Sequence, residues 1–264
     1  MRGYSALLEG RRQTESSKRE HSMRNPTMPI LIALALVVAG ARLGDLLAQT
    51  PSGQIEHEHA DDHHMSSHSD QGYQHSFGQA EMWAKEFDDP ARDAWQKPDE
   101  ILDALHLEGT SRVADLGAGT GYFSVRIAKR VPEGKLFSVD IEPDMLRYLR
   151  ERAHHEHLNV IVPILASVDS ANLPEPVDLV LVVDTYHHID NRIAYFAKLK
   201  ASLRPNGRLA IVDFKADSPD GPPPEHRVSP EKVTAELNAA GYSLVATHQF
   251  LPRQYFLVFQ SKAS

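Results

Sequence analysis

Three glycines at alternate positions follow an apolar run in the segment VADLGAGTGYFS, residues 113–124. Glycine-rich turns after a strand often hold nucleotides, because a backbone without side chains can approach the ligand closely. The dinucleotide fingerprint spaces its glycines G-x-G-x-x-G around a pyrophosphate, whereas Gly117, Gly119 and Gly121 follow G-x-G-x-G. Asp115 stands just before the turn, where a carboxylate disfavours a pyrophosphate and favours an ammonium group.

Two more carboxylates follow the next two predicted strands. Asp140 ends the strand FSVD, where it can accept hydrogen bonds from ribose hydroxyls, as it could in a dinucleotide site too. Asp169, in SVDSANLP, can accept one from an adenine amino group. The ends of parallel strands share one edge of a sheet, so the three acids predict a site for a cationic, phosphate-free adenosine derivative. S-adenosylmethionine, which carries an ammonium and a sulfonium, is such a compound.

Five ordered segments between Trp95 and the C-terminus resemble the class I S-adenosylmethionine-dependent methyltransferases, in the small-molecule group that includes quinone-biosynthesis enzymes. The resemblance implies a Rossmann-like α/β fold, with a seven-stranded, mostly parallel sheet, an antiparallel last strand and helices on both faces. It implies methyl transfer from S-adenosylmethionine to O, N or C of a small molecule. The segments are VADLGAGTGYFS, FSVDIEPDML, VDSANLP, VDLVLVVDTYHHI and LRPNGRLAIVDF.

The same resemblance implies where the cofactor lies along these segments. The methionine part is expected to contact Asp115, Gly117, Ala118, Gly119 and Gly121. The ribose is expected to contact Asp140 and Ile141, and the adenine Val168 and Asp169. A domain of the same type that has lost cofactor binding is the alternative, and the presence of all three carboxylates argues against it.

The acceptor is expected beyond the ends of the fourth and fifth strands, where the chain supplies DTYHH and Asp213. A base is needed there only when the acceptor must lose a proton. His187 is the best candidate for that base, with Tyr186 and Asp184 as positioning groups. The alternative is a packing role for one or both histidines of the pair His187 and His188.

Two segments are predicted to shape the acceptor pocket. The helical region before the sheet carries Trp83, Phe87, Trp95 and Gln96 and could close over the cofactor. The proline-rich loop at residues 216–229 could act as a lid bearing His226 and Arg227. Simple packing and connection is the alternative for both segments.

The elements that must position these residues alternate between strand and helix patterns, which is typical of an α/β domain. Two helical pieces, broken at Pro90 and Pro98, precede the sheet. Ser229 is a plausible N-cap, and Ile193, Phe196, Leu199 and Leu203 share one helical face. We expect strands at 111–117, 135–141, 159–167, 177–184 and 207–214, a hairpin of 242–250 with 254–260, and helices at 122–131, 143–157, 191–203 and 229–241.

Composition excludes several classes of function. A net charge of −8 on 264 residues argues against a nucleic-acid partner, which requires a basic surface. The chain has no cysteine, which excludes disulfides, cysteine-ligated zinc and thiol nucleophiles. It also excludes the thiol-dependent arsenite methyltransferases among the related families.

The N-terminal part predicts an exported or membrane-anchored protein. Residues 1–49 contain an apolar run, Ile30 to Ala39, preceded by Arg24 and followed by small residues. The run is short for a membrane span and has the length of a signal-peptide core. The cleavage site could lie directly after the run or near Ala48. An uncleaved anchor that associates with the membrane is the alternative. Export conflicts with the site predicted above, which needs a cofactor made in the cytosol.

Residues 50–78 form a polar linker rich in histidine and acidic residues. Imidazole and carboxylate groups suit zinc, copper or nickel, but the spacing lacks a tetrahedral pattern, and no catalytic metal site is expected. A solvated spacer and loose divalent-metal binding both stay open. The methyltransferase domain is expected over residues 80–264. The competing hypothesis is an exported metal-binding or ligand-sensing protein that uses this fold without turnover.

Overall fold

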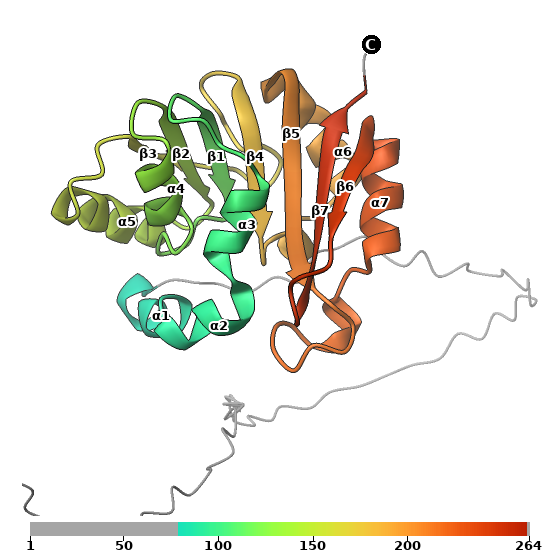
Figure 1. Cartoon of the computed structure of the whole chain (residues 1–264), viewed down its shortest axis with the longest axis horizontal. Helices are drawn as coiled ribbons and strands as arrows, with labels where there is room; N and C mark the ends of the chain where they lie inside the picture. Colours follow the sequence, from blue (N-terminus) through green and yellow to red (C-terminus); the bar gives the residue numbers. More distant parts are fainter. Residues whose placement is uncertain (1–78, 263–264) are drawn as a thin grey trace, which may run out of the picture. The chain divides into compact units, whose positions relative to one another are not determined.

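The computed structural model describes residues 79–262, all within the unit His64–Ser264. One seven-stranded sheet runs through them in the order β3-β2-β1-β4-β5-β7-β6 (Figure 1). β7 is antiparallel to both of its neighbours, and the pairs among the first five strands are parallel. The strands are β1 (Arg112–Leu116), β2 (Lys135–Asp140), β3 (Ile161–Leu165), β4 (Val177–Val183), β5 (Leu203–Phe214), β6 (Tyr242–His248) and β7 (Gln254–Ser261). The predicted fold class is confirmed.

Helices cover both faces of the sheet (Figure 1). α3, α4 and α5 contribute to one buried apolar cluster, and α6 and α7 contribute to a second cluster on the opposite face. The bounds are α3 (Pro98–Ala104), α4 (Ser124–Arg130), α5 (Pro143–His155), α6 (Arg192–Leu199) and α7 (Pro230–Ala239). A sheet covered in this way needs strands that are apolar on both sides.

β4 shows why the continuous apolar run VDLVLVV forms a central strand. Successive side chains of a strand point to opposite faces of the sheet. Leu179 and Leu181 accordingly join the cluster under α3 to α5, while Val180 and Val182 join the one under α6 and α7. All four side chains are at most 1% exposed.

Local capping fixes where α7 begins. Ser229 is its N-cap, and its hydroxyl accepts a hydrogen bond from the backbone N–H of Lys232 at 3.2 Å. Gly241 follows the helix with a φ of 93°, a left-handed conformation that suits glycine. The predicted N-cap is therefore confirmed.

α6 differs from its prediction. The helix ends at Leu199 and a short 3-10 turn, η3 (Lys200–Ser202), leads into β5, which begins at Leu203. Phe196 and Leu199 are buried as predicted, but Ile193 is 42% exposed. Leu203 was wrongly assigned to the helical face because its apolar side chain also fits the start of the following strand.

The segment before the sheet consists of α1 (Ala80–Phe87), η1 (Pro90–Arg92) and α2 (Asp93–Gln96), followed by α3. Residues 80–96, here called the covering segment, lie beyond the carboxyl ends of the parallel strands (Figure 1). Because β7 is antiparallel, its first residue, Gln254, reaches the same edge, paired with Phe214 at the end of β5. This edge therefore gathers the carboxyl ends of the five parallel strands β1 to β5, the start of β7 and the covering segment.

Within residues 79–262, no helix has the length and apolarity needed to cross a membrane. The predicted targeting segment and the histidine-rich linker lie outside the described residues, as do the boundaries predicted between them.

Candidate functional site

The turn after β1 is held by close packing. Gly117 has a φ of 80°, and a Cβ atom there would collide with the side chain of Thr185, which follows β4. The N–H groups of Gly117 and Ala118 donate to the carbonyl of Val139 in β2, at 2.8 and 3.0 Å. Glycine at this position therefore lets three strand ends approach one another, which is a packing reason additional to the expected room for a ligand.

Gly119 differs from Gly117. A Cβ atom at Gly119 would lie at an ordinary contact distance of 3.6 Å from the ring of Phe87 in α1. The Gly119 N–H donates to Oδ2 of Asp140 at 2.7 Å, and Glu142 donates its N–H to Oδ1 at 2.9 Å. The structure thus brings the predicted turn glycine and the predicted ribose acid into contact beneath the covering segment.

Asp115 lies under the turn and is 3% exposed. Its Oδ2 accepts a hydrogen bond of 2.6 Å from Ser124, whose hydroxyl is also 2.8 Å from that of Ser138. Burial raises the pKa of Asp115 to about 6, and the hydrogen bond from Ser124 offsets part of that rise. Burial likewise raises the pKa of Asp140, although backbone N–H donors stabilise its charged form. Two neighbouring strands therefore end in buried acids that a cation would stabilise.

The predicted adenine side is an exposed apolar surface at the ends of β2 and β3. Ile141 is 50%, Leu165 51% and Val168 74% exposed. The Asp169 side chain is also exposed, and its carboxylate accepts hydrogen bonds from Ser167 at 2.8 Å and Lys198 at 3.3 Å. These contacts lower the pKa of Asp169, that of Ser167 having the larger effect. The adenine contact of Asp169 stays a prediction.

The covering segment is joined to the sheet by a closed ring of four hydrogen-bonded side chains. Arg92 donates from Nη2 to Asp184 at 2.9 Å and from Nε to Gln96 at 2.6 Å. Gln96 Nε2 donates to Gln254 at 2.7 Å, and Gln254 Nε2 donates to Asp184. Burial raises the pKa of Asp184 to about 6, and the guanidinium of Arg92 opposes the rise. Gln96 and Gln254 are at most 1% exposed, so the ring excludes water from the edge of β4 and β7.

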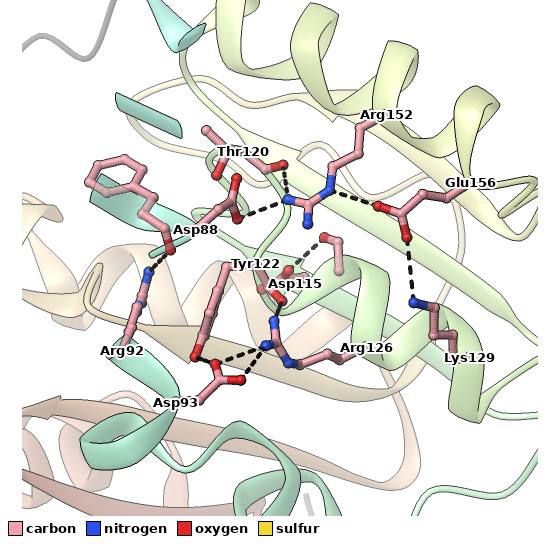
Figure 2. A network of polar contacts seen from close by, with 12 residues as sticks. Asp88, Arg92, Asp93, Asp115, Thr120, Tyr122, Arg126, Lys129, Arg152 and Glu156 are labelled. Atoms are coloured by element: carbon pink, nitrogen blue, oxygen red, sulfur yellow. Dashed lines mark hydrogen bonds and ion pairs between the residues drawn. The ribbon is translucent and has the colours of Figure 1, made fainter. Parts of the chain in front are cut away.

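Further ion pairs hold the covering segment (Figure 2). Asp88 accepts from Arg152 of α5 at 2.8 Å, and Asp93 pairs with Arg126 of α4 at 2.8 Å. The guanidinium groups of Arg92 and Arg126 each lie 4.1 Å from the centre of the Tyr122 ring. Of the residues predicted in this segment, Gln96 therefore lies in the ring and Phe87 lies next to Gly119, while roles of Trp83 and Trp95 at the cofactor stay predictions.

Sequence reasoning missed Arg92 and Gln254. Neither residue belongs to a motif that the sequence analysis identified. Nothing in the local sequence around Arg92 or Gln254 distinguishes them from ordinary surface side chains. The ring joins positions 92 residues apart (Arg92 and Asp184) and 158 residues apart (Gln96 and Gln254). Only tertiary structure reveals such a contact.

His187 lies in the 3-10 turn η2 (Tyr186–His188) after β4, and it is 4% exposed. Its Nδ1 lies 2.9 Å from Oδ1 and 3.0 Å from Oδ2 of Asp213 near the end of β5. Burial by itself would lower the pKa of His187, but the nearby carboxylates of Asp213 and Asp184 together outweigh burial and the pKa is raised. The structure thus unites the predicted base with the acid at the neighbouring strand end.

Tyr186 does not face this group. Its side chain is fully buried and stacks on Phe196 of α6, and its hydroxyl donates to Glu236 of α7 at 2.7 Å. Arg192 holds the same carboxylate at 2.8 Å. The expected positioning role of Tyr186 therefore finds no support in its contacts, because they fix the helices on the second face of the sheet.

The loop at residues 216–229 is tied to itself. Arg227 donates to the carbonyls of Pro222, Ala216 and Ser218, each at 2.8 Å. Its guanidinium is therefore engaged in holding the loop, and the expected role at the acceptor is not supported. His226 lies exposed in the short 3-10 turn η4 (Pro224–His226).

No group of three or more histidine, cysteine, aspartate or glutamate side chains is placed to hold a metal ion within residues 79–262. The metal-binding alternative for the linker at residues 50–78 falls outside that range and stays a prediction.

Comparisons with known proteins agree with this geometry. A family profile described as a methyltransferase domain matches residues 113–207. A crystal structure of a SAM dependent methyltransferase from Aquifex aeolicus superposes with a TM-score of 0.64 at 26% identity, covering 68% of this chain and 97% of that one.

Curated relatives are similar over about half of this chain. A malonyl-[acyl-carrier protein] O-methyltransferase of Acetivibrio thermocellus is 29% identical over 133 residues, which cover 50% of this chain and 46% of that protein. A trans-aconitate 2-methyltransferase of Rhodopseudomonas palustris is 30% identical over 122 residues, covering 46% and 43%. The matched part of the chain thus spans about half the length of these relatives.

Proposed function

Because the chain belongs to the class I S-adenosylmethionine-dependent methyltransferase superfamily, we propose that it transfers a methyl group from S-adenosylmethionine to a small-molecule acceptor. The observation that carries the proposal is the placement of buried acids beside an exposed apolar surface at one edge of the sheet. That edge is where ligands of open α/β folds bind.

The residues present fit this cofactor. Gly119 exposes backbone next to Asp140, whose carboxylate is suited to ribose hydroxyls, and Ile141 and Leu165 offer an apolar surface to adenine. The buried Thr120 hydroxyl, in the same turn, lacks a hydrogen-bond partner among the described residues. Two guanidinium groups contact this turn, and both are engaged by protein acids: Arg152 donates to the Thr120 carbonyl and to Asp88, and Arg126 donates to the Tyr122 carbonyl and to Asp93. The site therefore suits a cationic adenosine better than a dinucleotide.

The sulfonium supplies an already activated methyl group, so the protein mainly has to align the acceptor with it. The covering segment would exclude water through the ring of Arg92, Gln96, Gln254 and Asp184. Asp115 and Asp140 would stabilise positive charge on the ligand by their own negative charge. The acceptor would lie between the covering segment and the ends of β4 and β5.

Isothermal titration of the full chain with S-adenosylhomocysteine, S-adenosylmethionine and NAD tests the proposal. We expect both adenosyl compounds to bind and NAD to bind far more weakly. Asp140→Asn should weaken adenosyl binding about 10- to 100-fold, the range for lost hydrogen bonds to a charged group. Asp217→Asn, which changes an exposed acid of the loop after β5, is the matched control. Preferential binding of NAD would overturn the proposal.

A further inference from the structure

We propose that a cavity between α6 and the loop joining β3 to β4 binds a small organic monocarboxylate, and that this ligand strengthens cofactor binding by releasing Asp169. The second part rests on the proposed function and on the predicted contact of Asp169 with adenine. The cavity has a volume of about 230 Å³. The side chains available to a ligand there include Leu173, Tyr195, Lys198, Leu199 and Ser202.

The cavity is separate from the candidate site. One wall is the loop at residues 170–173, and the other is formed by the end of α6 and the turn η3. None of the described residues predicted to contact the cofactor or the acceptor lines it. Asp169 directly precedes Ser170, however, so the cavity wall and the predicted adenine contact belong to one loop.

Tyr195 presents an unpartnered hydroxyl to the cavity. The side chain is 7% exposed, and its hydroxyl makes no hydrogen bond with any described residue. Within residues 79–262, only Thr120 has a fully sealed side-chain polar atom without a partner, so the Tyr195 oxygen reaches solvent at the cavity that its side chain lines. Burial, with a smaller effect of Asp169, raises the pKa of Tyr195. The hydroxyl therefore stays protonated at neutral pH and can donate to a ligand.

The charges of the lining select an anion with one negative charge. Among the described residues that line the cavity, Lys198 is the only charged one. Its ammonium lies 3.3 Å from Oδ2 of Asp169 and its side chain is 57% exposed, so the pair is weak and can exchange partners. Ser202 adds a second hydroxyl to that of Tyr195. One ammonium and two hydroxyl donors match a carboxylate, whereas a phosphate dianion would keep an unpaired charge.

Apolar side chains provide a surface for the carbon skeleton of the ligand. Leu199 is 4% and Ala171 5% exposed, and Leu173 packs against the same buried cluster. The volume lies below the range of about 300–1,000 Å³ that is typical of sites for drug-sized ligands. The cavity therefore suits a small organic acid.

The loop that forms one wall also holds Asp169. Ser167 and Ser170 exchange backbone hydrogen bonds at 2.9 and 3.2 Å, which fixes the turn around Asp169. Both carboxylate oxygens of Asp169 are engaged, Oδ1 by the hydroxyl of Ser167 and Oδ2 by Lys198. A ligand carboxylate that draws Lys198 into the cavity would free Oδ2 to accept a hydrogen bond from the adenine amino group.

The expected coupling between the two ligands is small. An exposed Lys–Asp pair contributes little free energy, so its release should tighten cofactor binding about threefold. Because coupling between two binding sites is reciprocal, the cofactor should tighten binding of the carboxylate by the same factor.

Benzoate, with benzamide and phenyl phosphate as matched probes, tests the site in the full chain by amide chemical shifts. We expect benzoate to bind more tightly than either probe and to shift resonances of residues 170–173 and 195–202. Lys198→Met, which removes the ammonium, should weaken benzoate binding about tenfold, and Tyr195→Phe should weaken it about threefold. Lys200→Met removes a neighbouring lysine outside the lining and should leave benzoate binding unchanged.

Four results would each overturn the site. They are equal binding of benzamide, tighter binding of phenyl phosphate, no shifts in these two segments, and unchanged benzoate binding in Lys198→Met.

Calorimetric titration with S-adenosylhomocysteine, with and without benzoate, tests the coupling. We expect benzoate to lower the dissociation constant about threefold in the wild type. The same benzoate concentration should have no effect in Lys198→Met, which should already bind the adenosyl compound more tightly. An unchanged dissociation constant in the wild type, or a benzoate effect that persists in Lys198→Met, would overturn the coupling. Failure of the wild type to bind S-adenosylhomocysteine would instead remove the proposed function, and the benzoate shifts would still decide the site.

Discussion

Asp115→Asn is expected to stabilise the ligand-free protein at pH 8, although it removes an acid predicted to contact the cofactor. Asp115 is buried, and burial raises its pKa from 3.8 to about 6. The rise of about two units corresponds to about 3 kcal/mol of unfavourable free energy for the charged side chain in the folded state. Asparagine avoids this penalty and can still accept the hydrogen bond from Ser124.

The sign of the pH dependence follows from the same shift. Because the pKa of Asp115 is higher in the folded than in the unfolded state, its contribution to stability is complete below about pH 4 and is lost as pH rises through about 6. The new amide needs a partner for its N–H groups, which costs about 1–2 kcal/mol at any pH. We therefore expect a gain of about 1–2 kcal/mol at pH 8 and a loss of similar size at pH 4.

Urea unfolding followed by circular dichroism at both pH values measures the difference. The quantity to compare is the change in unfolding free energy between Asp115→Asn and wild type, with Asp217→Asn as the exposed control. A change that is the same at pH 4 and pH 8 would show that Asp115 is not a buried acid of raised pKa. Binding of S-adenosylmethionine should weaken in the same variant about tenfold, because a stabilising negative charge is lost.

Four further outcomes are expected. Tyr186→Phe should lower the unfolding free energy by about 1–2 kcal/mol through loss of the hydrogen bond to Glu236, with S-adenosylhomocysteine binding unchanged; weakened binding would contradict its core placement. Arg92→Ala should speed amide hydrogen exchange in residues 80–96 at least tenfold by opening the ring, whereas Arg130→Ala, which removes exposed ion pairs, should not. Adenosyl binding measured by calorimetry should weaken as pH falls below about 6, because protonation of Asp115 removes negative charge next to the ligand; a flat profile would refute this. A C-terminal reporter should fractionate with exported or membrane material, and a purely cytosolic signal would refute the targeting prediction.

Much of the fold followed from local patterns in the chain. The run VDLVLVV has apolar side chains on both faces of a strand, so both faces must be buried, and it forms the central strand β4. Pro143 and Ser229 begin helices where their backbone and side-chain chemistry suits the first turn. Leu203 was misassigned because an apolar residue after a helix fits a strand equally well when its neighbours in space are unknown.

The same distinction between local sequence and tertiary contacts applies to the candidate site. The sequence by itself determined the carboxylates Asp115 and Asp140, the glycine turn between them and the acidic and histidine residues at the ends of the fourth and fifth strands, since strand ends of a parallel sheet meet at one edge. The tertiary structure alone decided that Arg92 and Gln254 close a ring with Asp184, that Asp213 holds His187, and that Tyr186 packs in the core. The reason is physical: residue type and spacing fix which groups reach an edge, but burial, charge pairing and hydrogen bonding depend on partners that lie far away in the chain.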